Sequence, residues 1–151
     1  MSIVVRPAAP EDVDGLGALK LRASLAWGNH THQIEALPEA RVFPPEHLPF
    51  ALVAEADGRL AGFATVLPRE DGGADLEDIF VEPALWRRGI GRALMAEADR
   101  AAGDAGAEVL RVIANARALG FYAACGFEVV GVVQTLFAPA PQMEKRLGPA
   151  C

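Results

Sequence analysis

Cysteine, lysine and long apolar runs are all scarce in this 151-residue chain. Its two cysteines, Cys125 and Cys151, are too few for the disulfide framework of a small secreted domain. No run of about 18 apolar residues is present, so the sequence predicts no membrane span. Residues 1–10 also lack the apolar segment of a signal peptide. These absences favour a cytoplasmic protein without a membrane partner.

Positive charge is also limited, because Lys20 and Lys145 are the only lysines and the net charge is −6. Proteins that wrap nucleic acid usually carry a basic face, so we expect no nucleic-acid partner. An acidic surface suits a cationic substrate, but it equally keeps an ordinary protein soluble. The length is that of one ordinary globular domain, so the sequence predicts a single domain over residues 1–151.

The first half of the chain mixes strand and helix patterns. We expect a strand at 3–6, a helix from Pro10 to about Trp27, a short helix at 31–37, and loop from there to residue 49. Gly15 and Gly17 are unfavourable inside the first helix. Two apolar runs, 50–56 and 59–67, flank Asp57-Gly58, a pair that favours the positive φ angles of a hairpin turn.

The second half predicts a crossover followed by strands. We expect strands at 74–81 and 109–114 around a helix at 89–105, then a helix at 116–125 capped by Asn115, and strands at 127–133 and 142–147. Pro139 and Pro141 mark a bulge or an edge. This order predicts an α/β (α+β) fold with a mixed, mostly antiparallel, twisted sheet of about six to seven strands and about four flanking helices.

The strongest candidate for a binding site is residues 82–94, where a strand ends, an arginine- and glycine-rich loop follows and a helix begins. The first turn of a helix has unpaired N–H groups and a partial positive charge, and glycines let the backbone approach an anion. A nucleotide P-loop is absent, and Leu94 occupies the third glycine position of a dinucleotide fingerprint. The pattern favours a phosphate site over a turn with solvated arginines. Its residues are Arg87, Arg88, Gly89, Ile90, Gly91, Arg92 and Ala93.

Two blocks of the sequence resemble the GNAT superfamily of N-acetyltransferases. Read from Arg88, residues 88–93 match the family signature Gln/Arg-x-x-Gly-x-Gly/Ala; read from Trp86, only the first position differs. Residues 115–127 are similar to the family's Asn-x-x-Ala-x-x-Phe-Tyr-x-x-x-Gly-Phe. The resemblance is weak before residue 50. It implies a GNAT-like fold and an enzyme that transfers an acetyl group from acetyl-CoA to a primary amine. We expect no metal.

The same resemblance implies where the cofactor lies. The pantetheine arm would pair with the backbone of Ile79, Phe80 and Val81. The pyrophosphate would bind the amides of residues 88–93. Asn115 would bind the pantetheine or the nearby backbone, and the thioester would be lined by Ala118, Phe121 and Tyr122.

Acid and base candidates follow from the reaction. The leaving thiolate needs a proton, which the phenol of Tyr122 can supply, although an aromatic residue there can also serve the core alone. The attacking ammonium must lose a proton, and a carboxylate on the strand before the loop often accepts it in this family. Glu77 is the first choice and Asp75 the second; strand alternation places both on one face and Asp78 on the other. Solvated acidic side chains remain the alternative for both.

The sequence says less about the molecule that accepts the acetyl group. His30, His32 and His47 are expected in the loop or the acceptor pocket, since His30 and His32 with Glu35 lack a fourth metal ligand. We expect a small cationic metabolite that attacks acetyl-CoA directly in a ternary complex. The alternative is an acyl-CoA sensor or partner-binding module without catalysis, and the acid–carboxylate pair favours the enzyme. The resemblance also allows a homodimer.

Overall fold

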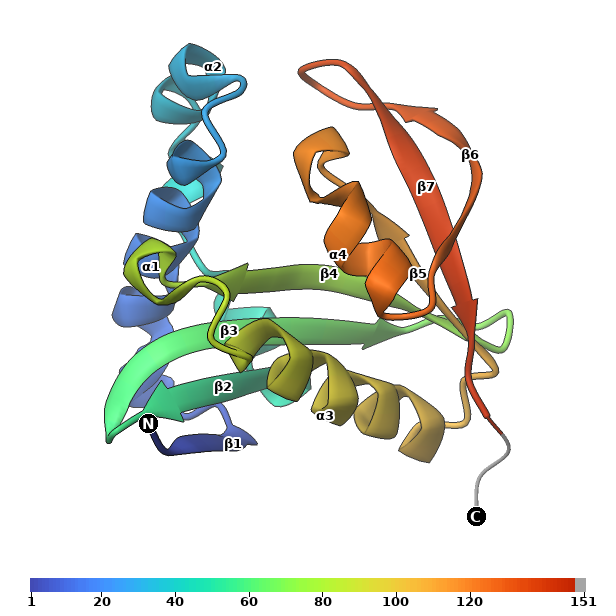
Figure 1. The fold of residues 1–151 in the computed structure, drawn as a ribbon, viewed down its shortest axis with the longest axis horizontal. Coiled ribbons are helices and arrows are strands. Elements are labelled where there is room, and N and C mark those ends of the chain that lie inside the picture. The colour runs from blue at the N-terminus through green and yellow to red at the C-terminus, as the bar shows by residue number, and fades with distance from the viewer. Residues whose placement is uncertain (149–151) are drawn as a thin grey trace. The chain divides into compact units, whose positions relative to one another are not determined.

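The computed structural model describes residues 1–148, and Figure 1 traces its elements along the chain. Seven strands form one mixed sheet in the order β1-β2-β3-β4-β5-β7-β6. The strands are β1 (Ile3–Pro7), β2 (Ala51–Ala56), β3 (Arg59–Pro68), β4 (Gly73–Val81), β5 (Val109–Ile113), β6 (Glu128–Gln134) and β7 (Pro139–Arg146). The α-helices are α1 (Val13–Ala26), α2 (Thr31–Ala36), α3 (Ile90–Asp104) and α4 (Leu119–Ala124). This architecture confirms the predicted fold class.

The 38–49 segment differs from its prediction as loop, because short 3-10 helices occupy it. The 3-10 helices of the described residues are η1 (Pro10–Asp12), η2 (Pro38–Arg41), η3 (Pro45–Phe50), η4 (Pro83–Leu85) and η5 (Ala116–Ala118). Pro38 and Pro45 each stand in the first turn of their helix, where the missing N–H costs no hydrogen bond. Prolines in this segment therefore start short helices.

The last strand is longer than predicted, since β7 begins at Pro139 rather than near Gln142. Pro139 and Pro141 pair with β6, while the pairing of β7 with β5 begins at Gln142. Proline is tolerated in this part of the strand, where hydrogen bonding on both sides is not required. The register of β6 shifts between Val129 and Gly131.

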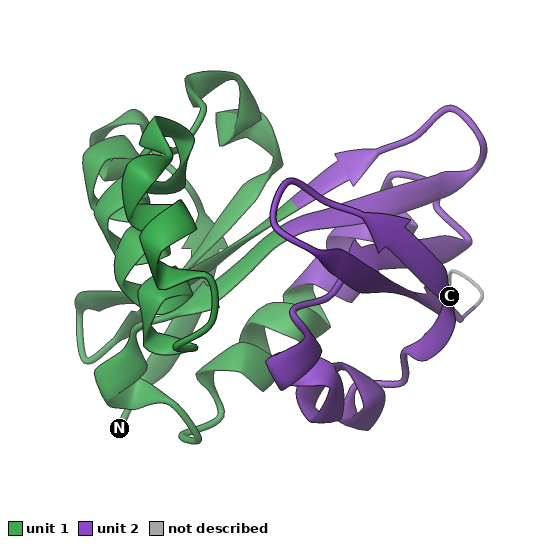
Figure 2. Cartoon of the chain, turned by 90° about the horizontal axis from the view of Figure 1, so that it is seen from above, with its two compact units in different colours: residues 1–65, 78–97 green, residues 66–77, 98–151 purple. Residues whose placement is uncertain are grey.

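Two compact units make up the chain, and Figure 2 colours them separately. Unit 1 contains residues 1–65 and 78–97, and unit 2 contains residues 66–77 and the chain from residue 98 onward. The expectation of one acetyltransferase domain stays a prediction. No helix within residues 1–148 is long and apolar enough to cross a bilayer, and Cys151 lies outside the described residues.

The core of unit 1 forms where α1 packs on β2 and β3. Its buried members are Leu16, Leu19, Ala23, Phe43, Ala51, Val53 and Phe63. Gly17 has a positive role in this packing, because a Cβ there would lie 2.5 Å from the carbonyl oxygen of Arg41. The glycine that looked unfavourable for the helix thus allows the η2 backbone to approach α1 closely.

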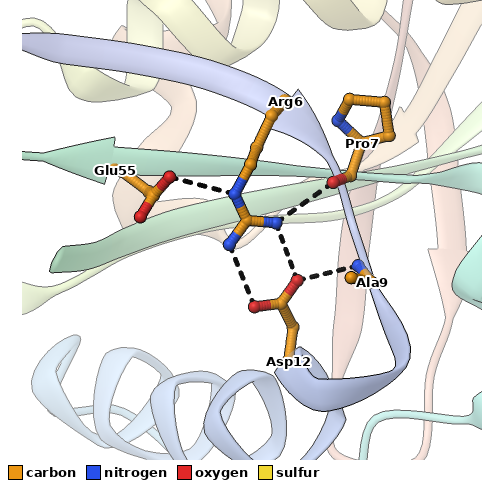
Figure 3. Close-up of polar contacts among 5 residues, drawn as sticks. All are labelled: Arg6, Pro7, Ala9, Asp12 and Glu55. Atoms are coloured by element: carbon orange, nitrogen blue, oxygen red, sulfur yellow. Dashed lines mark hydrogen bonds and ion pairs between the residues drawn. The ribbon is translucent and has the colours of Figure 1, made fainter. Parts of the chain in front are cut away.

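A polar network secures the beginning of α1 (Figure 3). The guanidinium of Arg6 on β1 donates to both carboxylate oxygens of Asp12, from Nη1 at 2.8 Å and Nη2 at 3.0 Å. Its Nε donates to Glu55 on β2 at 3.0 Å. Asp12 also accepts from the amide of Ala9 at 2.8 Å. The network joins two strands to the turn from which α1 starts.

In unit 2, Lys145 on β7 joins three elements. Its ammonium lies 2.7 Å from the Asp99 carboxylate on α3 and donates to the carbonyl of Cys125 at 3.1 Å. The same ammonium lies 4.8 Å from the centroid of the Phe127 ring. The Lys145 side chain is only 11% exposed. Through these contacts it fixes the end of α4 against β7.

Candidate functional site

The arginine-rich loop of unit 1 has the backbone shape of an anion site. Arg87 and Gly89 both take positive φ, 65° and 88°, on either side of Arg88. Helix α3 begins immediately afterwards at Ile90, and the amide of Ala93 donates to the carbonyl of Gly89 at 3.0 Å. Helix geometry leaves the amides before Ala93 without a partner in the preceding turn, so they are directed away from the helix.

Three contacts within unit 1 fix the approach to this loop. Glu82 accepts two hydrogen bonds from Arg22 on α1, at 3.1 and 2.7 Å. The indole Nε1 of Trp86 donates to the carbonyl of Val81 at 2.8 Å. The ring of Trp86 lies 4.6 Å from that of Trp27, centroid to centroid. Helix α1 therefore holds the loop through an ion pair and an aromatic contact.

Charge in the loop favours an anion. Arg87, Arg88 and Arg92 are all exposed, and the first turn of α3 contains no acidic residue. The partial positive charge of the helix N-terminus adds to these guanidinium groups. In a chain of net charge −6, this is a local reversal of sign.

The end of β4 leads directly into the loop. The parallel register of β4 with β5 pairs Gly73 to Asp75 with Val109 to Arg111, while β4 itself continues to Val81. Of the predicted pantetheine residues, Phe80 packs on Phe63 with ring centroids 5.6 Å apart, and Ile79 and Val81 are half-buried. The amide of Glu82 donates to the carbonyl of Ala61 on β3 at 2.8 Å, which fixes the strand end.

In unit 2, Asn115 caps the turn before α4 as predicted. Its Oδ1 accepts from the amide of Arg117 at 2.9 Å, and its carbonyl accepts from Ala118 at the same distance. The Tyr122 side chain on α4 is only 8% exposed. Its ring meets those of Phe121 and Phe127 edge-on, with centroids 5.4 and 5.7 Å away. The phenol is thus held in a defined orientation.

The two predicted bases differ in their surroundings. The carboxylate of Asp75 lies 3.1 Å from Nη1 of Arg69, so it is already an ion-pair partner. Glu77 is exposed on the same strand. The burial pattern of β4 alternates as predicted, with Asp75 and Glu77 on the more open face and Asp78 buried on the other.

Asp78 is a site candidate that the sequence pattern did not single out. It is 8% exposed, and Thr65 on β3 is fully buried; they are the buried polar or charged residues of residues 1–148. Burial raises the pKa of the Asp78 carboxyl, and Thr65 and the charges of Lys20 and His47 partly oppose that rise. Alternation had placed Asp78 on the opposite face from Asp75 and Glu77, which was the one signal available from sequence.

His30 and His47 lie in different elements of the structure. His30 begins α2 with a positive φ of 58°, whereas His47 lies in η3 with its ring 6.4 Å from that of Phe43. No group of three His, Cys, Asp or Glu side chains suited to a metal ion occurs in the described part of the chain. Phe43 belongs to the core, while Phe50 is 41% exposed.

A family model for the acetyltransferase (GNAT) family matches residues 19–127, well over half of the chain. The chain belongs to the GNAT acetyltransferase family. It is therefore an acyltransferase of the GNAT type, and the matched range includes both of the sequence blocks that resemble the family. A search of curated proteins gives no match.

Solved GNAT structures share its fold. The PaiA N-acetyltransferase of Thermoplasma acidophilum in complex with coenzyme A is 22% identical, with a TM-score of 0.79 over 97% of this chain and 99% of that one. The ribosomal-protein-S18-alanine N-acetyltransferase of Escherichia coli is 19% identical, with a TM-score of 0.73 over 99% and 97%. Nourseothricin acetyltransferase is 32% identical, with a TM-score of 0.61 over 71% and 70%.

Proposed function

We propose that this GNAT protein transfers the acetyl group of acetyl-CoA to a primary amine, a small cationic metabolite, by direct attack in a ternary complex. The observation that carries the proposal is the loop before α3. Its two positive-φ residues, Arg87 and Gly89, directly precede the N-terminus of α3, and its arginines are exposed. Such a site suits a pyrophosphate, which the coenzyme supplies. A structural relative that holds coenzyme A supports the choice of donor.

The remaining donor contacts are proposed from the resemblance to the family. The amides of residues 88–93 bind the pyrophosphate, and the backbone of Ile79 to Val81 pairs with the pantetheine arm. The carbonyl of Val81 already accepts from Trp86, so the pairing uses the other groups of this segment. Asn115 supports the turn that carries Ala118 and Phe121, which line the thioester.

The chemistry needs two protons removed from the ammonium nitrogen and one supplied to the leaving thiolate. An ammonium group loses a proton to a carboxylate of β4, directly or through water, and the free amine attacks the thioester carbonyl. The C–S bond then breaks, Tyr122 protonates the thiolate, and the second proton lost by the nitrogen restores the phenol of Tyr122 through water. Among the sequence-predicted bases, Glu77 is favoured over Asp75, whose carboxylate is engaged by Arg69.

The test is release of free coenzyme A from acetyl-CoA in the presence of a panel of primary amines. Chromatographic detection keeps the protein's own cysteine thiols out of the signal. Tyr122→Phe is expected to retain coenzyme A binding and to lower turnover at least about tenfold, because the acid is lost. Unchanged turnover would exclude the acid role. Tight coenzyme A binding with no turnover on any amine would instead indicate an acyl-CoA sensor or partner-binding module.

Arg88→Gln tests the phosphate loop, with Arg59→Gln as a matched control. Both arginines are exposed and both changes remove one positive charge, but Arg59 lies at the start of β3. Arg88→Gln should raise the KM for acetyl-CoA about fivefold to tenfold at low salt, since a charge-assisted contact is lost. Equal effects of the two substitutions would show that only the overall charge matters.

A further inference from the structure

The helix that carries Tyr122 is too short to hold its own position. α4 has six residues, and isolated helices shorter than about 12–15 residues are marginal in water. The place of α4 in unit 2 therefore depends on how its end is closed and on what packs against it. This dependence extends to the phenol of Tyr122, which lies in the last turn of the helix.

A Schellman motif closes the end of α4 and ties Tyr122 to Phe127. Gly126 takes the positive φ, 97°, that this motif favours, and its amide donates to the carbonyl of Ala123 at 3.1 Å. The amide of Phe127 donates to the carbonyl of Tyr122 at 3.0 Å. The two rings, 5.7 Å apart between centroids, make the apolar contact that often accompanies the motif. The direction of the Tyr122 ring is thus coupled to the position of Phe127.

Lys145 on β7 packs against this motif. Its ammonium donates at 3.1 Å to the carbonyl of Cys125, one of the carbonyls that follow a helix end, where a cation also complements the helix dipole. The ammonium lies 4.8 Å from the centroid of the Phe127 ring. The lysine stem is so close to Gly126 that a Cβ there would lie 3.2 Å from Cδ. One side chain therefore lies against each of residues 125–127.

Asp99 on α3 keeps the ammonium of Lys145 in place. Its carboxylate accepts from the ammonium at 2.8 Å. A lysine side chain loses much rotamer freedom when it is held in one geometry, and the ionic partner offsets that cost. Asp99, Lys145 and residues 119–127 all belong to unit 2, so the whole set of contacts lies within one compact unit.

We infer that Lys145 is a positioning residue for the acid of the reaction: by fixing residues 125–127, it holds the Tyr122 phenol where the leaving thiolate needs a proton. The inference rests on the proposed acetyl transfer, in which Tyr122 protonates that thiolate. Lys145 acts through Tyr122 and exchanges no proton itself. A misplacement of about 1 Å can cost on the order of 100-fold in rate, so a contact outside the reacting groups can govern turnover.

A double-mutant cycle separates positioning from general stability. Lys145→Met keeps an apolar stem and removes the ammonium. On an amine that turns over, it should lower kcat about tenfold and leave the KM for acetyl-CoA within about twofold. In a Tyr122→Phe background the same substitution should change kcat less than about twofold, because the group that it positions is gone. A loss of similar size in both backgrounds would overturn the inference, since Lys145 would then act through the fold as a whole.

Arg146→Met is the matched control. Arg146 is the next residue of β7, its side chain is exposed, and its substitution removes the same charge. Its kcat should stay within about twofold of wild type, and a loss equal to that of Lys145→Met would contradict the inference. Asp99→Asn is the second variant if Lys145→Met does not fold, because it is nearly isosteric and removes only the anchor. It should lower kcat about threefold, and a loss that persists in Tyr122→Phe would count against positioning.

A measurement without turnover separates this inference from the proposed function. Tyr122 is the only tyrosine of the chain, so ¹³C-ring-labelled tyrosine gives one set of ring signals. The rings of Phe121 and Phe127 should displace these signals from those of free tyrosine. In Lys145→Met the signals should move toward those of free tyrosine, and in Arg146→Met they should not.

The two failures then have different signatures. If Tyr122→Phe turns over as fast as wild type, the proposed acid role fails, while shifted ring signals in Lys145→Met still show that the lysine orients the ring. Unchanged ring signals in Lys145→Met refute the inference, whether or not any amine is acetylated.

Discussion

Replacement of Asp12 by alanine tests how α1 is anchored in unit 1. The carboxylate accepts three hydrogen bonds, two from Arg6 at 2.8 and 3.0 Å and one from the Ala9 amide at 2.8 Å (Figure 3). The Asp12 side chain is 12% exposed and that of Arg6 34% exposed. The pair is thus shielded on the aspartate side and partly solvated on the arginine side.

The expected loss in the free energy of unfolding is about 3 kcal/mol. A hydrogen bond to a charged group contributes about 1.5–3 kcal/mol, but the three bonds share one carboxylate and are not additive. Solvent around Arg6 lowers the sum further. Arg6 also keeps its bonds to Glu55 and to the Pro7 carbonyl, so its charge is not stranded. For a chain of this size the loss corresponds to about 6–12 °C in Tm.

The pH dependence gives a second, independent readout. Hydrogen bonds from Arg6, and then the Ala9 amide, lower the pKa of Asp12 below its ordinary value. A lowered folded-state pKa stabilises the protein fully above the unfolded value of about 3.9, and this stabilisation is lost as the pH falls through the folded value. The difference between wild type and Asp12→Ala should be complete at pH 7 and should shrink below about pH 4.

Urea unfolding followed by circular dichroism at pH 7 and at several acidic pH values measures both effects. Asp14→Ala is the control, because Asp14 is an exposed carboxylate in the first turn of the same helix. It should cost no more than about 0.3–1 kcal/mol, the usual contribution of a charge at a helix N-terminus. The reasoning is refuted if the two variants lose equal stability, or if the Asp12→Ala difference does not depend on pH.

Two further predictions concern unit 1. In Gly62→Ala, the new Cβ would lie 2.7 Å from the carbonyl oxygen of Phe80, in the segment that we propose binds pantetheine. The substitution should therefore destabilise the protein by about 1–3 kcal/mol in thermal unfolding and raise the KM for acetyl-CoA. If neither the stability nor the KM changes, the close packing is contradicted. Asp78→Asn should stabilise the protein on the order of 1 kcal/mol at neutral pH, since the raised pKa of Asp78 means that stability is lost as pH rises through it and asparagine cannot ionise. Urea unfolding at neutral and acidic pH should show this gain disappearing at acidic pH; a gain that grows on acidification would show the opposite sign.

Local chemistry made several features predictable. The Asp57-Gly58 turn has the positive φ values, 50° and 81°, that its residue types favour. The loop around Gly89 and the cap at Asn115 also appear where the sequence places them. In each case a residue's own backbone preference or a hydrogen bond a few residues away decides the structure.

Packing could not be predicted in the same way. Gly17 is poor for a helix, and only the position of the Arg41 carbonyl explains it. The proline-rich segment folds into η2 and η3 because it covers a core to which Phe43 contributes. Such contacts join residues that are distant in sequence, and no local pattern records them.

Sequence alone was enough to recognise the family and to predict the turn that leads into α3, because glycine, arginine and helix-start preferences act within a few residues of one another. The face of Asp78 on β4 also followed from alternation. Only the tertiary structure decided that this face is buried, and that Thr65, Lys20 and His47 come together around it. The electrostatic environment of a carboxyl depends on which atoms exclude water from it, and those atoms come from β3, α1 and η3.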